Sequence, residues 1–148
     1  MAGATGIGPW GKGVTNVLDG GVFTQCGNGS CVSATAQVLT GGKVTEAQVV
    51  AKLGEWADPI KLPGVLNELA PSAAPWKGTY FGSGDEALVI ANKGPMGAVL
   101  QAPGEGAHMV TISPIGAGKF LVQDTGVGKT YQVTTAWIKQ YVSAGVWK

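Results

Sequence analysis

The sequence predicts an α+β fold, with most helices in the first part of the chain and an antiparallel sheet in the second. Three observations lead to this prediction. Most segments with helix caps precede Gly94, short runs rich in Val, Ile, Leu, Phe and Tyr follow it, and the two kinds of segment do not alternate as in a parallel α/β fold. A chain of 148 residues with 45% hydrophobic residues is long enough for one domain with a buried core.

The first residues carry no clear helix or strand signal. Residues 1–20 contain six glycines and one proline and show no sustained hydrophobic period. We therefore expect a loop-rich lead-in over residues 1–20 and a single domain over residues 21–148.

The first expected helix follows a glycine-rich loop. It covers Cys31 to Thr40, with Ser30 as its N-cap and Gly41-Gly42 at its end. Because its residues are small and uncharged, we expect this helix to be buried in the core.

Three shorter helices are expected next. Thr45 and Gln48 have the spacing of a capping box and open a helix that ends at Gly54. The other two are expected over Pro63 to Ala70, where a proline occupies the first turn, and over Asp85 to Lys93, where acidic residues occupy it.

The residues after Gly94 predict an antiparallel meander with glycines in its turns. A last short helix is expected over Ala136 to Tyr141, and Val146-Trp147 is expected to add an edge strand. The four strands of the meander are expected over Gly97 to Gln101, His108 to Ser113, Lys119 to Asp124 and Lys129 to Val133.

Composition excludes several classes of function. The ten lysines are scattered, arginine is absent and the net charge is +1, so the dense basic face of a nucleic-acid-binding protein is missing. No apolar run is long enough to span a membrane, and residues 1–20 lack the pattern of a signal peptide. A single histidine excludes metal sites that need a pair of histidines.

Cys31 is the candidate nucleophile. A thiol in the first turn of a helix lies beside unpaired N–H groups and the positive end of the helix dipole, which favour the thiolate. The thiolate needs a partner that transfers protons, and His108 is the sole imidazole of the chain. His108 begins one expected strand and Asp124 ends the next, so an antiparallel pairing brings the carboxylate to the imidazole.

These residues resemble the papain-like cysteine peptidases. Gln25 lies six residues before Cys31, Gly29-Ser30-Cys31 opens a helix, and His108 lies sixteen residues before Asp124. The superfamily places its oxyanion-hole Gln, nucleophile, base and orienting Asn or Asp in this order and at these separations. The short chain and the Asp look more like the bacteriocin-processing peptidases and the papain-fold domains of bacterial polymorphic toxins.

The sequence also departs from papain. Val32 stands where papain has an aromatic residue after the nucleophile, and no Trp follows Asp124 closely. His108 follows Cys31 by fewer residues than in papain. These differences fit a compact member of the superfamily.

The resemblance implies a role for each residue. Cys31 would be the nucleophile, His108 the general base and then the general acid, and Asp124 the group that orients the imidazole. The Gln25 side chain and the Cys31 backbone N–H would form the oxyanion hole. The resemblance implies no cofactor and no metal.

The resemblance further implies a cysteine protease that hydrolyses peptide bonds in a protein substrate. We favour an interbacterial toxin, blocked by a cognate immunity protein, over a leader-processing peptidase, because no transporter or membrane segment is attached and the chain looks like a trimmed C-terminal module. We expect secretion or delivery by a bacterial secretion system without a cleavable signal peptide, and action in the cytoplasm of the target cell.

Several alternatives stay open. The same site suits a papain-fold deamidase or acyltransferase toxin, and a binding or inhibitor module with Cys31 as a buried structural residue needs no chemistry at all. The separation of Cys26 and Cys31 allows a disulfide, and both cysteines with His108 and Asp124 are a further option for a metal site. We expect four of the tryptophans to pack in the core or in a groove: Trp56, Trp76, Trp137 and Trp147.

Overall fold

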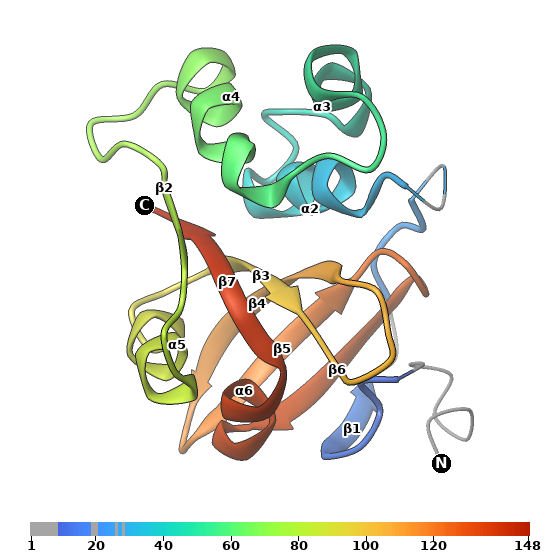
Figure 1. Cartoon of the computed structure of the whole chain (residues 1–148), viewed down its shortest axis with the longest axis vertical. Helices are drawn as coiled ribbons and strands as arrows, with labels where there is room; N and C mark the ends of the chain where they lie inside the picture. The colour runs from blue at the N-terminus through green and yellow to red at the C-terminus, as the bar shows by residue number, and fades with distance from the viewer. Residues whose placement is uncertain (1–8, 19–20, 26, 28) are drawn as a thin grey trace.

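One antiparallel sheet organises the fold (Figure 1). The computed structural model describes residues 9–18, 21–25, 27 and 29–148. Across the described residues the strand order is β1-β6-β5-β4-β3-β7-β2, and all neighbouring strands are antiparallel. The strands are β1 (Val14–Leu18), β2 (Lys77–Tyr80), β3 (Met96–Leu100), β4 (His108–Gly116), β5 (Lys119–Asp124), β6 (Lys129–Thr134) and β7 (Val142–Trp147).

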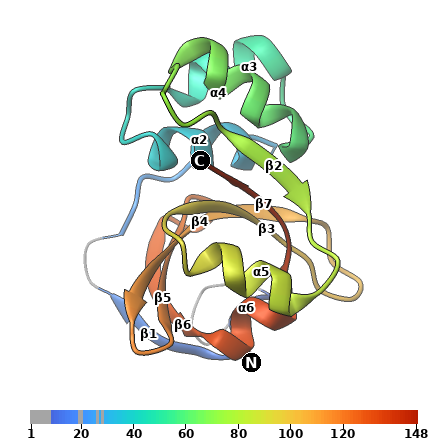
Figure 2. The ribbon, with the colours of Figure 1, turned by 90° about the vertical axis from the view of Figure 1, so that its left-hand side faces the viewer.

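Helices cover the sheet from two sides (Figure 2). On one side lie α2 (Cys31–Leu39), α3 (Glu46–Leu53), the short 3-10 helix η1 (Pro59–Lys61) and α4 (Leu62–Leu69). On the other side α5 (Gly84–Ala91) and α6 (Thr135–Tyr141) pack against each other. None of the helices in the described ranges has the length and apolar character needed to cross a membrane.

The α+β prediction is confirmed, and local caps explain why the helices begin where they do. At α3 the Thr45 hydroxyl accepts a hydrogen bond from the Gln48 N–H at 3.2 Å, and Gln48 Oε1 accepts one from the Thr45 N–H at 2.9 Å. This reciprocal pair is the predicted capping box. At α5 the cap is Ser83, whose hydroxyl accepts from the Glu86 N–H at 3.2 Å.

The predicted meander β3-β4-β5-β6 is confirmed, but three strand assignments differ from expectation. The prediction of an edge strand at Val146-Trp147 is wrong, because β7 lies between β3 and β2. One edge of the sheet is β2, a strand that we did not predict from the sequence. The other edge is β1, which lies within the expected loop-rich lead-in, residues 1–20, and pairs with β6.

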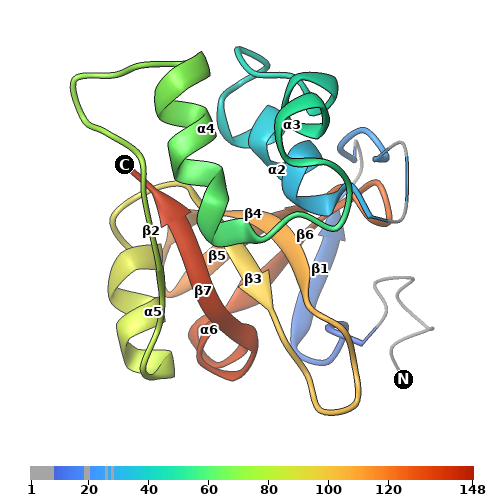
Figure 3. The same cartoon turned by 45° about the horizontal axis from the view of Figure 1, so that its top comes forward.

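Two hydrophobic cores lie on opposite faces of the sheet. Val99 and Met109 belong to the core beneath α2 to α4, whereas Ala98, Leu100 and Val110 belong to the core that includes α5 and α6. Successive residues of β3 and β4 therefore serve different cores, as the period of two in a strand requires. The helix α2 lies over β3 and β4 (Figure 3).

Candidate active site

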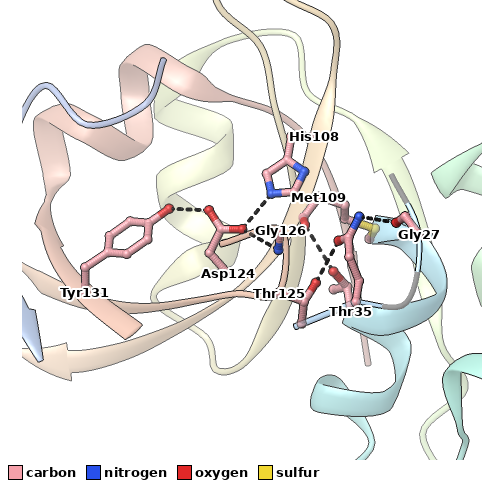
Figure 4. A network of polar contacts seen from close by, with 9 residues as sticks. Gly27, Thr35, His108, Met109, Asp124, Thr125, Gly126 and Tyr131 are labelled. Atoms are coloured by element: carbon pink, nitrogen blue, oxygen red, sulfur yellow. Dashed lines mark hydrogen bonds and ion pairs between the residues drawn. The ribbon is translucent and has the colours of Figure 1, made fainter. Parts of the chain in front are cut away.

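Cys31 is the first residue of α2 and carries a free, half-buried thiol. The His108 imidazole and the backbone N–H groups of Val32 and Met109 act on the sulfur and favour its thiolate form. A buried bond fixes the helix on β4, since the Thr35 hydroxyl donates to the Met109 carbonyl at 3.1 Å (Figure 4). The nucleophile is therefore held between a helix and a strand.

The loop before Cys31 closes on itself. Ser30 occupies the predicted N-cap position, but its side chain makes no bond to the N–H groups of α2. Instead its hydroxyl donates to the Gly27 carbonyl at 2.8 Å and accepts from the Gly27 N–H at 3.1 Å. Ser30 therefore shapes the loop that delivers the thiol and does not cap α2 through its side chain.

His108 and Asp124 meet as the strand pairing predicts. Thr111 of β4 lies opposite Gln123 of β5, which places the start of β4 near the end of β5. His108 Nε2 lies 2.7 Å from Asp124 Oδ1, so Nε2–H donates to the carboxylate (Figure 4). This leaves Nδ1 as the ring nitrogen for the interaction with Cys31. The His108 imidazole thus interacts with both the Cys31 thiol and the Asp124 carboxylate.

Asp124 is fully buried, and its oxygens are occupied by neutral donors as well as by His108. The Gly126 N–H donates to Oδ1 at 3.0 Å, and the Tyr131 hydroxyl donates to Oδ2 at 2.9 Å (Figure 4). Burial and the nearby Asp124 charge raise the pKa of Tyr131 above its ordinary value, so the phenol stays a donor. The carboxylate is therefore fixed in orientation before it acts on His108.

The thiol and the imidazole stabilise each other's charged forms. Burial alone raises the pKa of Cys31, but the hydrogen bond and positive charge of His108 outweigh it, and the pKa of Cys31 is lowered. Burial alone lowers the pKa of His108, but the Asp124 carboxylate and Cys31 raise that pKa to about 9. The pair therefore favours a thiolate beside an imidazolium.

Gln25, the expected oxyanion-hole residue, is held by the turn that follows β5. Its backbone N–H donates to the Thr125 carbonyl at 2.9 Å, and its Oε1 accepts from the Thr125 hydroxyl at 3.1 Å. Its Nε2 donates to the Gly27 carbonyl at 2.8 Å. The structure thus brings all four predicted residues, Cys31, His108, Asp124 and Gln25, to the boundary between the helices and the sheet.

An aromatic wall covers His108, and the sequence analysis missed it. The Trp10 ring stacks on the imidazole with centroids 5.9 Å apart and planes 10° apart. Trp10 is buried, and its carbonyl accepts a hydrogen bond from Trp137 Nε1–H at 2.8 Å. The sequence has no tryptophan soon after Asp124, and the ring that stacks on His108 instead comes from the expected lead-in. No fixed spacing in the sequence connects Trp10 to His108.

A cleft of about 230 Å³ opens beside the thiol and the imidazole. Trp56 lines it with a side chain that is 77% exposed, and its backbone has a φ of +56°. The Trp56 N–H donates to the Gly29 carbonyl at 2.7 Å, and a Cβ on Gly29 would lie 2.7 Å from the indole. Trp56, which we expected to pack in the core or in a groove, is thus largely exposed at the cleft. The cleft is also lined by Ala57, Pro59, Val99, Ala107 and Met109.

Two expectations involve Cys26, which lies outside the described residues. These are the disulfide with Cys31 and the metal site of both cysteines with His108 and Asp124. Within the ranges that the structure describes, no group of three or more His, Cys, Asp or Glu side chains is arranged to hold a metal ion.

The structure is similar to that of a known peptidase. A double glycine motif protease from an AMS/PCAT transporter, solved in complex with the leader peptide, superposes with a TM-score of 0.63 at 15% sequence identity. The match covers 91% of this chain and 92% of that chain. No protein-family model and no curated protein matches the sequence. The likeness shows that this chain has the papain-like fold.

Proposed function

We propose that this chain is a cysteine peptidase that hydrolyses peptide bonds through Cys31, His108 and Asp124. The observation that carries the proposal is a thiol of lowered pKa beside an imidazole that is itself hydrogen-bonded to a buried carboxylate. The cleft beside it offers a mainly apolar place for a peptide. The papain-like fold of a leader peptidase supports the same activity.

The chemistry follows from the charged pair. The Cys31 thiolate attacks the peptide carbonyl carbon, and the negative charge moves to the carbonyl oxygen, which the Gln25 amide and the Cys31 N–H stabilise. When the C–N bond breaks, the His108 imidazolium gives its proton to the leaving amine. The neutral imidazole then takes a proton from water, whose oxygen attacks the thioester and releases the acid and Cys31.

The test uses three variants of the whole chain. We expect Cys31→Ala and His108→Ala to abolish hydrolysis of a fluorogenic peptide that contains a Gly-Gly site, with unchanged circular dichroism. Cys26→Ser is the matched control and is expected to retain activity. Equal loss in all three variants would contradict the proposal and favour a structural or metal-binding role for the cysteines.

Mass spectrometry separates hydrolysis from the related chemistry of the same site. After incubation with a bacterial lysate, a peptidase produces new internal N-termini. A deamidase instead adds about one mass unit to intact targets, and an acyltransferase adds the mass of an acyl group. The thiolate and oxyanion hole suit all three reactions, so absence of new N-termini would overturn the peptidase assignment.

Two biological roles follow from this chemistry. We propose delivery into the cytoplasm of a target bacterium as a toxin, with a cognate immunity protein that occupies the cleft, because the motifs resemble papain-fold toxins. Removal of leader peptides is the second candidate, favoured by the leader complex of the similar structure. Cytoplasmic expression of wild type and Cys31→Ala in bacteria distinguishes them: growth arrest that depends on Cys31 supports the toxin, and cleavage of precursors without arrest supports leader processing.

A further inference from the structure

We propose that Thr125 is a positioning residue that fixes the Gln25 amide as an oxyanion donor. Thr125 is 1% exposed and directly follows Asp124. Its hydroxyl donates to Gln25 Oε1 at 3.1 Å, and its carbonyl accepts from the Gln25 N–H at 2.9 Å. One residue thus holds both the main chain and the side chain of Gln25. The inference rests on the proposed function, in which Gln25 stabilises the oxyanion.

The contacts determine which end of the amide faces which neighbour. The Gly27 carbonyl only accepts hydrogen bonds, so it takes Gln25 Nε2, at 2.8 Å. The Thr125 hydroxyl can then donate to Oε1. With its oxygen held by Thr125 and its nitrogen held by Gly27, the amide does not rotate, so its N–H groups keep fixed directions.

The same turn positions the acid of the triad. Asp124 Oδ1 accepts the Gly126 N–H at 3.0 Å, and the Asp124 carbonyl accepts the Gly128 N–H at 2.9 Å. Three consecutive residues therefore fix the carboxylate, the hydroxyl and the glycine N–H relative to one another (Figure 4). Because Asp124 orients His108 and Thr125 orients Gln25, this turn sets the distance between the proton-transferring group and the oxyanion donor.

The test compares Thr125→Val with Thr125→Ser. Valine keeps the shape of threonine but lacks the hydroxyl, and serine keeps the hydroxyl. We expect Thr125→Val to lower kcat about five- to tenfold, the equivalent of one neutral hydrogen bond. KM and the rate of Cys31 alkylation by iodoacetamide should stay the same, since neither depends on the oxyanion. Thr125→Ser should restore most of kcat.

Thr111→Val is the matched control. Like Thr125, Thr111 is a buried threonine, but it lies in the strand β4. Its hydroxyl has no hydrogen-bond partner among the described residues. Its replacement should leave kcat unchanged. The inference is wrong if Thr125→Val lowers the rate of Cys31 alkylation together with kcat, or if Thr111→Val lowers kcat by the same factor. Either result would mean that the Thr125 hydroxyl has a general structural role.

A double-mutant cycle tests whether Thr125→Val lowers kcat through the Gln25 side chain. If Thr125 acts only through this amide, Thr125→Val has no further effect on kcat once Gln25→Ala is present. Additive losses in the double variant would overturn the inference, as would an unchanged kcat in Thr125→Val alone.

A second measurement separates this inference from the proposed function. If wild type cleaves no peptide, the peptidase assignment fails, but the position of Gln25 can still be read from its side-chain amide signals in ¹⁵N NMR spectra. Thr125→Val should then shift these signals and speed their hydrogen exchange, while Thr125→Ser should not. Unchanged signals in Thr125→Val would overturn the positioning role by themselves.

Discussion

Cys31 is half-buried, and a thiol in such a place ordinarily stays protonated. Here the imidazolium of His108 reverses the effect, and the Asp124 carboxylate keeps the imidazolium charged. Three residues from different elements are thus needed for one reactive sulfur. Removal of His108 takes away the charge that lowers the pKa of Cys31, and removal of Asp124 takes away the charge that raises the pKa of His108.

The charged pair predicts a bell-shaped pH dependence of kcat/KM. The acid limb lies where Cys31 gains a proton, below the ordinary pKa of a thiol, because its pKa is lowered. The alkaline limb lies near pH 9, where His108 loses the proton that it gives to the leaving amine. Asp124→Asn removes the charge that raises the His108 pKa, so its alkaline limb should move to lower pH.

Two titrations measure these limbs. The rate of Cys31 alkylation follows the thiolate, and kcat/KM for a peptide follows thiolate and imidazolium together. An alkaline limb of the wild type at 6.5, the ordinary pKa of histidine, would show that Asp124 does not act on His108 as the geometry implies.

The sequence allowed prediction of the residues that carry local signals, but not of those that meet only in the fold. Cys31 follows a glycine-rich loop at a helix start, and His108 and Asp124 lie at matching ends of neighbouring strands. Trp10 and Thr125 have no such signal. Trp10 reaches His108 from a segment without hydrophobic period, and a threonine after an aspartate looks like an ordinary turn residue.

At the scale of elements, helices and strands that carry their own caps or turn residues could be predicted from the sequence. Strands that form only by pairing with a neighbouring strand could not. The strand β5, Lys119–Asp124, has the predicted bounds because glycines lie near both of its ends and it contains a run of apolar residues, Phe120 to Val122. The edge strand β2 has the sequence KGTY and little apolar pattern, so only its pairing with β7 makes it a strand. The same pairing turns β7 from the expected edge into an interior strand.

The turn after β5 tolerates no side chain at Gly126. A Cβ there would lie 2.7 Å from His108 Cε1 and 3.2 Å from Asp124 Oδ1. We therefore expect Gly126→Ala to push the imidazole away from Cys31 and to lower kcat at least about tenfold, a loss equivalent to one misplaced catalytic group. Steady-state kinetics and circular dichroism measure activity and folding.

Gly106→Ala is the control for this variant. Gly106 also lies near His108 in the chain, but a Cβ there would meet nothing within 4 Å. It should retain wild-type kcat. Full activity in Gly126→Ala would contradict the prediction, because it would mean that kcat does not depend on the present position of the His108 imidazole.

At the scale of the whole molecule, Trp10 connects the N-terminal segment to the site and to one of the two cores. We expect Trp10→Ala to lower the free energy of unfolding by about 3–5 kcal/mol, and Leu66→Ala in the other core to lower it by about 2–5 kcal/mol. Urea titrations measure both. Only Trp10→Ala should also slow Cys31 alkylation under native conditions, because Leu66 is not among the residues that touch His108 or line the cleft.

Equal slowing in both variants would contradict this prediction. It would mean that loss of stability alone, and not the stacked ring, controls the reactivity of the thiol. Trp10→Phe keeps an aromatic face over His108 and should retain more of the alkylation rate than Trp10→Ala.

The interior place of β7 has a consequence during synthesis. A ribosome makes Cys31 early, but the sheet stays open between β3 and β2 until residues 142–147 have left the exit tunnel. The nascent chain therefore carries its cysteine without a completed sheet to support the strands of His108 and Asp124. We therefore expect the strands that carry His108 and Asp124 to take their final place in the sheet only once β7 has paired with β3.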